Sequence, residues 1–363
     1  MRRNGVKMQS NTEKIDIKAL TLEELKASLK TIGEKEFRAK QIYEWLHVKL
    51  ARSFDEMTNL SKELRTKLAS EYELVCVTEL ERYESKIDGT VKFLFRLPDG
   101  NVVECVLMKY HHGNSVCISS QVGCRMGCRF CASTLGGLTR NLRTSEMLDE
   151  VYQLQRLSGE RVSNIVIMGT GEPMDNYDNF VKFVRMISSL DGLNISQRNI
   201  TVSTCGLVPK MRALAEEGLS ITLALSLHAP NDEERAKIMP VANSYKLQDV
   251  LNACDYYYEK TGRRISYEYS LVDGVNDTAA CAKELSRLLK GKNCHVNLIP
   301  VNPIKERDYK RSTGNNIQNF KNILEKNRIN VTIRREMGSD INAACGQLRK
   351  SYTDKTMVQE VEQ

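Results

Sequence analysis

Three cysteines stand close together in the stretch "CRMGCRFC", which covers residues 124–131 and has the spacing Cys-x3-Cys-x2-Cys. Clustered cysteines in a chain without a secretory signal point to metal or redox chemistry more than to structural disulfides. Four thiolates would complete a structural zinc site or a closed iron–sulfur cluster. Three thiolates leave one metal position open, and an open iron can bind a substrate or cofactor directly. Cys117, seven residues before Cys124, is an alternative fourth ligand.

A second group of polar residues stands in "GTGEPMDNYDN", which begins at Gly169. Gly169 and Gly171 allow backbone to approach a ligand closely, because glycine has no Cβ. Glu172 can pair with an ammonium group, and Pro173 ends the preceding strand. A turn from strand to loop that binds nothing is the alternative interpretation of this stretch.

A repeat of short strands and amphipathic helices must position these residues. From Ser115 onward, apolar strands alternate with helical patterns such as "SEMLDEVYQLQRL" and "YDNFVKFVRMISSL". This alternation predicts an α/β fold with a parallel sheet, specifically a partial (β/α)6 TIM-like barrel of about six units. In such barrels the chemistry lies at the carboxyl ends of the strands. The polar stretches "GTGEP", "STCG", "SLHAPND", "DGVND" and "PVNP" all follow predicted strands.

A small helical domain precedes the barrel. "TLEELKASLKTIG" has Thr21 as a predicted N-cap and ends at Gly33, and two further helical patterns follow. This accessory domain is either a packing cap or a module that contacts RNA, because basic helix faces fit both. "TVKFLFRLPDGNVVECVLMKY" predicts two strands around the turn Pro98-Asp99-Gly100. The predicted division is a disordered segment (1–17), the helical domain (18–75), a β-hairpin extension (76–110), the barrel (111–350) and a polar tail (351–363).

Composition excludes some classes of protein. Of 363 residues, 41% are hydrophobic, so a sizeable core can form. The N-terminal stretch has no apolar signal-peptide core, and no apolar run approaches the ~20 residues of a membrane span. We therefore expect a cytoplasmic protein with no membrane contact. The net charge of +7 is compatible with a polyanionic partner such as RNA, without requiring one.

The cysteine triad, in the loop after the first barrel strand, resembles the signature of the radical S-adenosylmethionine (SAM) superfamily. This resemblance implies that Cys124, Cys128 and Cys131 hold three irons of a [4Fe–4S] cluster. The amino and carboxylate groups of SAM would chelate the fourth iron, and an electron from the cluster would cleave SAM to a 5′-deoxyadenosyl radical. Glu172 would meet the SAM amino group. The βα repeat and the stretch "GTGEP" are both expected for a SAM-binding protein, whereas a zinc site would require neither.

The resemblance extends over residues 20–350 to the RlmN/Cfr family of RNA adenosine methyltransferases. The resemblance rests on seven motifs, which follow one another in the order found in the family. They are "CISSQVGCRMGCRFCASTLGGLTRNL", "MGTGEPMDNYDN", "VSTCGLVP", "LALSLHAPNDEER", "LVDGVND", "VNLIPVNP" and "DINAACGQL". "GEPMDNYDN" and "SSQVGC" look like the RlmN branch, which methylates adenine C2, whereas the Cfr branch methylates C8. The implied SAM contacts are Gly171, Glu172, Ser203, Ser226, Leu227, His228 and Asn302.

The family chemistry implies three catalytic residues. Two SAM molecules are used per turnover, and one of them methylates Cys345. The other provides the radical that activates this methyl group for addition to C2. Cys117 then removes the C2 proton and attacks Cys345, which leaves a transient disulfide, so we predict that the two thiols come within disulfide reach. Glu104 matches the family's proton acceptor. The alternatives are buried core positions for both cysteines, and a solvated strand carboxylate for Glu104.

The resemblance also implies the partners. The substrates would be 23S ribosomal RNA, at an adenosine of the peptidyl-transferase centre, and transfer RNA, at the adenosine 3′ to the anticodon. Both reactions need an unstacked adenosine. A flavodoxin-like protein would supply electrons, and a monomer is expected. A Cfr-type C8 methyltransferase and a non-catalytic iron–sulfur RNA-binding protein are the alternatives.

Overall fold

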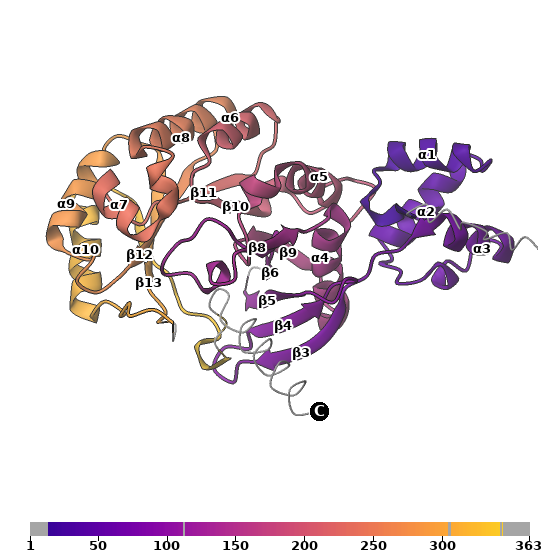
Figure 1. Cartoon of the computed structure of the whole chain (residues 1–363), viewed down its shortest axis with the longest axis horizontal. Coiled ribbons are helices and arrows are strands. Elements are labelled where there is room, and N and C mark those ends of the chain that lie inside the picture. Colours follow the sequence, from indigo (N-terminus) through magenta and orange to yellow (C-terminus); the bar gives the residue numbers. More distant parts are fainter. Residues whose placement is uncertain (1–13, 112, 304–305, 342, 344–363) are drawn as a thin grey trace, which may run out of the picture. The chain divides into compact units, whose positions relative to one another are not determined.

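The computed structural model describes residues 14–111, 113–303, 306–341 and 343 (Figure 1). The chain divides into two compact units between Cys76 and Val77, and each is described separately. Among the described residues, no helix is both long and apolar enough to cross a membrane.

The first unit is built from three helices and a short strand pair. Thr21 caps α1 as predicted, since its hydroxyl accepts the Glu24 N–H and the Glu24 carboxylate accepts the Thr21 N–H. Strand β1 pairs in parallel with β2, so residues 15–17, which fall in the segment expected to be disordered (1–17), belong to this unit. The elements are β1 (Ile15–Asp16), η1 (Ile17–Ala19), α1 (Leu22–Thr31), α2 (Phe37–His47), η2 (Phe54–Glu56), α3 (Lys62–Glu71) and β2 (Tyr72–Glu73).

Apolar residues one helical turn apart form the core of this unit. Leu25 and Leu29 on α1 are fully buried, and so are Ile42 and Leu46 on α2. The i, i+4 spacing places each pair on one helix face, so the helices pack through these faces. The core of the helical unit therefore follows directly from the sequence pattern.

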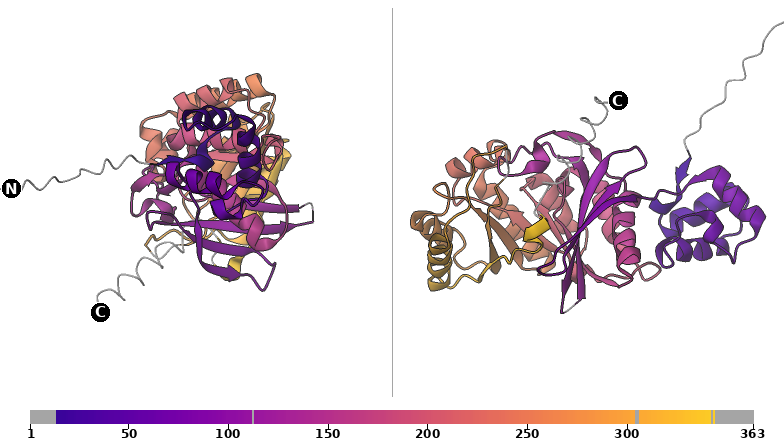
Figure 2. Two further views of the ribbon diagram at one scale, coloured as in Figure 1. Left: turned by 90° about the vertical axis from the view of Figure 1, so that its right-hand side faces the viewer. Right: turned by 90° about the horizontal axis from the view of Figure 1, so that it is seen from below.

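The second unit contains a ten-stranded sheet with the order β14-β13-β12-β11-β10-β9-β6-β5-β4-β3. Seven strands of this sheet, β6 and β9 to β14, are parallel, as the repeat of strands and helices predicted. Strands β14 and β3 form the two edges, so the barrel is partial, as expected (Figure 2). The parallel strands are β6 (Gly113–Ile118), β9 (Val162–Ile167), β10 (Ile200–Thr204), β11 (Thr222–Ser226), β12 (Ile265–Leu271), β13 (Cys294–Pro300) and β14 (Val331–Ile333).

Three antiparallel strands extend the sheet at its other end. The predicted hairpin is present as β4 (Val91–Arg96) and β5 (Val102–Tyr110). A third strand, β3 (Thr78–Glu84), pairs with β4 and was not predicted. Its sequence "TELERYE" is rich in charged residues because the strand lies at the sheet edge, where side chains stay partly solvated.

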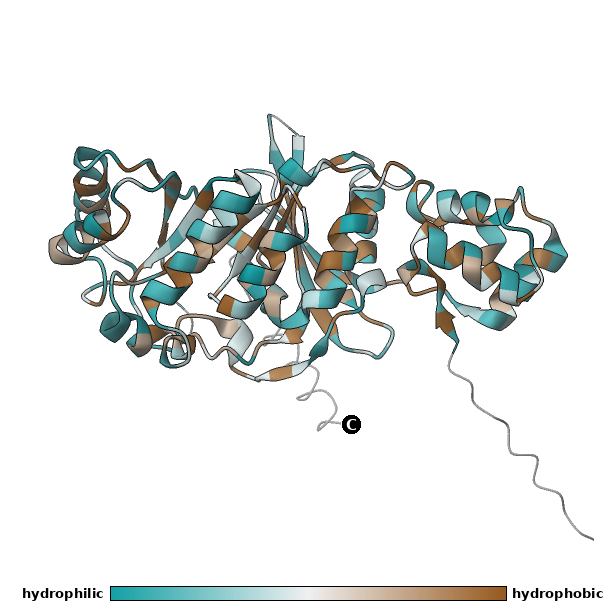
Figure 3. Ribbon diagram, turned by 90° about the horizontal axis from the view of Figure 1, so that it is seen from above, coloured by the Kyte–Doolittle hydropathy of each residue, from teal (hydrophilic) through white to brown (hydrophobic). Residues whose placement is uncertain are grey.

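Helices cover the outside of the curved parallel sheet (Figure 1). Apolar and polar residues alternate along them, as expected for helices with one face on a sheet (Figure 3). In α5, for example, Phe180, Val184 and Ile187 are fully buried. The helices are α4 (Thr144–Ser158), α5 (Tyr177–Ile187), α6 (Val208–Glu216), α7 (Asp232–Ile238), α8 (Leu247–Thr261), α9 (Ala279–Leu288) and α10 (Gly314–Lys326).

One helix places a carboxyl group in the core. Glu150 on α4 is fully buried, and its Oε2 accepts the Cys105 thiol at 2.9 Å and the Ser119 N–H at 2.8 Å. Its Oε1 has no hydrogen-bond partner among the described residues. Burial raises the pKa of Glu150 from 4.5 to about 8, although the bonds from Cys105 and Ser119 oppose this.

We expect Glu150 to make folding stability depend on pH. Its pKa is raised in the folded state, so that state binds the proton more tightly than the unfolded chain does. The free energy of unfolding should therefore fall as pH rises between 4.5 and about 8, by at most about 1.4 kcal/mol per pH unit. Glu150→Gln should flatten this slope in urea titrations at pH 5, 6, 7 and 8.

Glu160→Gln is the control for this measurement. Hydrogen bonding from Asn114 lowers the pKa of Glu160, so this carboxylate contributes to pH dependence only below 4.5. The slope between pH 5 and 8 should therefore survive the Glu160 substitution. An unchanged slope in Glu150→Gln would show that the buried carboxyl group does not titrate in this range.

Candidate functional site

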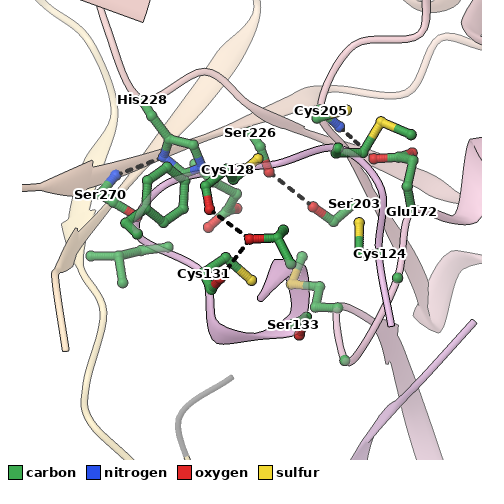
Figure 4. Close-up of a pocket in the computed structure, with 18 of the residues that line it drawn as sticks. Cys124, Cys128, Cys131, Ser133, Glu172, Ser203, Cys205, Ser226, His228 and Ser270 are labelled. Carbon is green, nitrogen blue, oxygen red and sulfur yellow. Dashed lines mark hydrogen bonds between the residues drawn. The ribbon is translucent and has the colours of Figure 1, made fainter. Parts of the chain in front are cut away.

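A cavity of about 210 Å³ lies at the carboxyl ends of the parallel strands. The three cysteines of the triad line it, together with Glu172 (Figure 4). The structure thus brings together residues from the ends of several separate strands, as a βα barrel does. The other predicted SAM contacts on its wall are Gly171, Ser203, Ser226, His228 and Asn302.

A short hairpin carries the cysteine loop. Strands β7 (Gln121–Gly123) and β8 (Leu138–Asn141) pair on either side of the loop. Within it, the short helix η3 (Ala132–Thr134) follows Cys131. The Thr134 hydroxyl donates to the carbonyl oxygens of Cys128 at 3.1 Å and Cys131 at 2.9 Å. These bonds hold the backbone of two predicted iron ligands in one conformation.

An apolar cluster packs against the cysteine loop. Cys205, Ala229, Ile238, Met239 and Val241 form this cluster, and Cys128 packs against it. The Arg129 N–H donates to the Ile238 carbonyl at 2.9 Å, which ties the loop to the end of α7. Cys128 therefore lies on a packed apolar base and not in open solvent.

Burial opposes ionisation of the thiols. It raises the pKa of Cys124 to about 12 and that of Cys128 further. Thiolates at such positions need a cation, and a bound metal deprotonates a coordinating thiol outright. The Ser133 hydroxyl on the cavity wall is also buried and has no partner among the described residues. Three thiols and an unpartnered polar group on one cavity fit the donor set of a three-cysteine iron–sulfur cluster. Among the described residues, no three His, Cys, Asp or Glu side chains are grouped closely enough to bind a single metal ion.

Glu172 is held in place by backbone groups. Its carboxylate accepts the Cys205 N–H at 2.8 Å and the Met174 N–H at 3.1 Å. Burial raises its pKa, while these hydrogen bonds oppose the rise. Each carboxylate oxygen can accept a further bond, so Glu172 is able to receive an ammonium group from the cavity.

Packing explains why glycine precedes Glu172. Gly171 has φ +106°, and a Cβ there would lie 2.6 Å from the Gln121 Cβ. Glycine is thus required by the close approach of the neighbouring loop, and not only by a ligand as the sequence suggested. Substitution at this position would displace Gln121, whose side-chain oxygen accepts the Glu172 N–H at 2.8 Å.

Ser203 and Ser226 lie at the ends of adjacent strands β10 and β11, and their hydroxyls are 3.2 Å apart. His228 is buried, and its Nδ1 accepts the Ser270 N–H at 2.9 Å. Burial and the charge of Arg235 lower the pKa of His228 to about 3, so it is neutral and its Nε2 carries the proton. The Leu227 side chain is fully buried, while its N–H bonds to the Glu268 carbonyl.

A second cavity of about 340 Å³ adjoins the first. Glu104 and Cys117 line it, and the two cavities share Met168, Gly169, Ile299, Asn302 and Arg334. Cys117 thus lines the neighbouring cavity, which is not where a fourth ligand for the triad would be expected. Glu104 is buried and forms an ion pair at 3.3 Å with Lys92, whose side chain is fully buried. The solvated-carboxylate alternative for Glu104 is therefore wrong.

The chain before residue 345 is anchored to the β3–β4 turn. Asp340 accepts the Ser85 hydroxyl at 2.6 Å and the Lys86 N–H at 2.9 Å. Gly338 donates its N–H to Asp88 at 2.9 Å. Gly338 has φ +64°, which turns the chain so that the Ala343 N–H bonds back to its carbonyl. Ala343 lines the second cavity, whereas Cys345 lies outside the described residues.

We expect Asp88→Ala to release this anchor. Burial alone would raise the pKa of Asp88, but hydrogen bonds from Gly338 and Thr90 lower it to about 2, so the carboxylate is ionised near neutral pH. Hydrogen bonds to charged groups contribute about 1.5–3 kcal/mol, so exchange of the Gly338 amide should accelerate at least ~10-fold. Hydrogen exchange with mass spectrometry measures this change. Lys86→Ala is the control, because its backbone N–H still reaches Asp340, and equal exchange in both variants would contradict the anchor.

The structure adds residues that the sequence did not single out. Glu268 on β12 lines the first cavity and accepts the Asn297 amide at 2.8 Å. Cys205 lines the same cavity and also belongs to the apolar cluster beside it. A glutamate inside the apolar alternation "RISYEYSL" was the available signal for Glu268. Lys92 in "TVKFLF" gave a similar signal, because a lysine in a buried strand needs a partner.

Comparisons with known proteins agree with this arrangement. Residues 15–74 match the model of the ribosomal RNA large subunit methyltransferase N-terminal domain, and residues 118–282 match that of the radical SAM superfamily. The chain is 94% identical over 354 residues to a probable dual-specificity RNA methyltransferase RlmN of Lachnoclostridium phytofermentans, which covers 98% of this chain and 99% of that protein. Identity to the protein of the same description from Lachnospira eligens is 64% over 339 residues, covering 93% and 97%.

A solved structure is similar over the same length. The crystal structure of a radical SAM methyltransferase from Sphaerobacter thermophilus superposes with a TM-score of 0.88 at 44% identity, covering 92% of this chain and 98% of that one. The radical SAM superfamily implies a [4Fe–4S] cluster and SAM as cofactors, and the triad cavity has the donors for them. From its cavity residues, its two-unit fold and these relatives, the chain belongs to the RlmN family of radical SAM RNA methyltransferases.

Proposed function

We propose that the protein methylates C2 of adenosine in 23S ribosomal RNA, at the peptidyl-transferase centre, and in transfer RNA, 3′ to the anticodon. The observation that supports this most is the pair of adjoining cavities. One is lined by the cysteine triad, and the other by Glu104 and Cys117. Because the two cavities share part of their lining, a radical formed in the first cavity would lie close to a base bound in the second.

The chemistry of C2 explains the need for a radical. Adenine C2 is an electron-poor aromatic carbon, so polar methyl transfer from SAM does not reach it. Cys124, Cys128 and Cys131 would hold the cluster, which together with SAM would supply a radical able to abstract hydrogen from a methyl group. Glu172 is proposed to orient SAM through its amino group, with two SAM molecules used per turnover. Ser203, Ser226, Leu227, His228 and Asn302 are the other proposed SAM contacts.

Cys345 and Cys117 are proposed to carry the one-carbon unit and then release it. Cys345 would take a methyl group from the first SAM. Loss of one hydrogen atom from this methyl group to the deoxyadenosyl radical would leave a carbon radical that bonds to C2. The adduct would then lose one electron to the cluster and its C2 proton to Cys117. The Cys117 thiolate would next attack the Cys345 sulfur, so the S–C bond breaks, the transferred carbon keeps that electron pair and takes up a proton as the new methyl group, and a disulfide remains. Ala343, two residues before Cys345, lines the cavity of Cys117. Two residues of extended chain span about 7 Å, which is compatible with the required meeting of the thiols.

Glu104 is proposed to accept a proton during this exchange. Its ion pair with buried Lys92 keeps the carboxylate in a defined position beside Cys117's cavity. A positioned base contributes about 10²–10⁴-fold to a proton transfer. The neighbouring Cys105 donates to Glu150 and is given no part in catalysis.

The RNA is proposed to bind with its target adenosine unstacked, because C2 is otherwise inside the helix. Partly assembled ribosomal RNA is then a better substrate than the mature ribosome. Binding should weaken steeply with salt if the basic residues contact phosphates. We further propose a monomer that acts in the cytoplasm and receives electrons from a flavodoxin-like protein.

Nucleoside analysis tests the proposal. The anaerobically reconstituted protein is incubated with SAM, a reductant and a 23S fragment or transfer RNA, and the digested RNA is analysed by mass spectrometry. 2-Methyladenosine is the expected product. 8-Methyladenosine would instead assign the chain to C8 chemistry, and RNA binding without any methylated adenosine would indicate a non-catalytic protein.

A further inference from the structure

Arg235 on α7 is a fully buried arginine without an anionic partner. Its Nε donates to the Leu227 carbonyl at 3.2 Å, and its Nη2 donates to the carbonyls of Cys205 at 2.6 Å and Ser226 at 3.3 Å. Its Nη1 is buried with no hydrogen-bond partner among the described residues. No carboxylate in the described chain forms an ion pair with it. A whole guanidinium charge is therefore buried against neutral groups.

Such an arrangement is unfavourable by itself. A buried charge that lacks a counter-ion is strongly destabilising, and carbonyl dipoles offset only part of the loss. The titratable groups around Arg235 include the thiols of Cys128, Cys205 and Cys254, the carboxyl group of Asp232 and the imidazole of His228, which is neutral. Asp232 accepts the Leu247 N–H at 2.7 Å and forms no ion pair with Arg235. Arg235 is thus surrounded by thiols and lacks the ion-paired carboxylate that a buried guanidinium usually has.

The position of α7 places this charge behind the cysteine cavity. Ile238, three residues after Arg235 and so on the same helix face, accepts the Arg129 N–H. Ile238 and Cys205 belong to the apolar cluster that supports Cys128. Cys205 both lines the cavity and accepts the guanidinium through its carbonyl. Arg235 is therefore separated from the cavity by little more than this wall.

We propose that Arg235 is the buried counter-charge of the iron–sulfur cluster and raises its reduction potential. This inference rests on the proposed cluster site of Cys124, Cys128 and Cys131. Three thiolates outweigh the charge of an oxidised four-iron core, so the assembly is an anion, and one-electron reduction makes it more negative. A fixed positive charge nearby stabilises the reduced form more than the oxidised form, and net charge is a main determinant of cluster potentials.

The test is a redox titration of the reconstituted cluster, followed by electron paramagnetic resonance, with a low-potential one-electron reductant. Arg235→Met removes the charge and retains much of the volume. Its reduced-to-oxidised ratio at a fixed ambient potential should fall at least ~10-fold, a shift of about 59 mV to more negative values for a one-electron couple. Arg235→Lys keeps the charge and should remain close to the unaltered chain.

Arg125→Met is the matched control. Arg125 neighbours Cys124 in sequence, but its side chain is 61% exposed and ion-paired with Asp175. Removing this charge should shift the potential much less than removing Arg235. Equal potentials in Arg235→Met and the unaltered chain would overturn the proposal. So would equal shifts in Arg235→Met and Arg235→Lys, because they would assign the effect to geometry.

A second measurement tests the proposal without the cluster, in case the Arg235→Met variant does not bind one. In urea titrations of the cluster-free protein, Arg235→Met should be at least as stable as the unaltered chain, because an unpaired buried charge has been removed. A less stable or unfolded variant would show that Arg235 acts as a cross-link between β10 and β11. If the unaltered chain itself forms no cluster signal, the cluster site fails, independently of the part given to Arg235.

Discussion

Cys345→Ala is expected to abolish RNA methylation while RNA binding and the cluster signal persist. In the proposed reaction this cysteine carries the carbon that is transferred, so its loss should lower the rate by about a thousandfold or more, as removal of a covalent catalyst does. Methylation is measured by mass spectrometry of the digested RNA, and binding by filter retention. Measurable turnover in Cys345→Ala would exclude the S-methylcysteine route.

Cys117→Ala should fail at a different step. Without the second thiol, the bond between the Cys345 sulfur and the transferred carbon is not broken. The variant should therefore accumulate a covalent protein–RNA adduct, visible as a band of reduced mobility on a denaturing gel. Cys281→Ala, on α9 and outside both cavities, is the control and should turn over normally. An adduct in the double variant Cys117→Ala, Cys345→Ala would contradict the assignment.

Cys131→Ala is expected to remove the iron–sulfur cluster and with it all methylation. Cys205→Ala is a demanding control, because Cys205 lines the same cavity but stands outside the triad. Iron and sulfide content after anaerobic reconstitution should fall severalfold in Cys131→Ala and stay close to that of the unaltered chain in Cys205→Ala. Loss of iron in the Cys205 variant alone would mean that Cys205 is the true third ligand.

The comparison of these two cysteines shows where local spacing is informative. Cys124, Cys128 and Cys131 are close in sequence, so any fold of the loop keeps their thiols near one another. The chemistry proposed for them could therefore be predicted from residue type and spacing. Cys205 is separated from them by more than seventy residues, and only the pairing of β9 with β10 brings its strand end to the cavity.

Buried charges were the least predictable feature. Lys92 meets Glu104, and Glu150 meets Cys105, through contacts between neighbouring strands or between helix and sheet. The strand pattern placed Glu104 on a strand but did not show which cation would lie beside it. Strand register decides such pairs, and register depends on the whole sheet. The edge strand β3 was missed for a related reason, since edge positions lack the apolar alternation that marks a strand.

The sequence by itself determined the repeat of parallel strands and helices, the cysteine triad and the polar strand ends, because hydrophobic period and residue spacing are local properties. Only the tertiary structure decided the anchor between Asp340 and the β3–β4 turn, the division into two adjoining cavities and the burial of Arg235 without a carboxylate. Each of these joins residues far apart in the chain. Their contacts exist only after the sheet has curved and its loops have packed, so no local pattern records them.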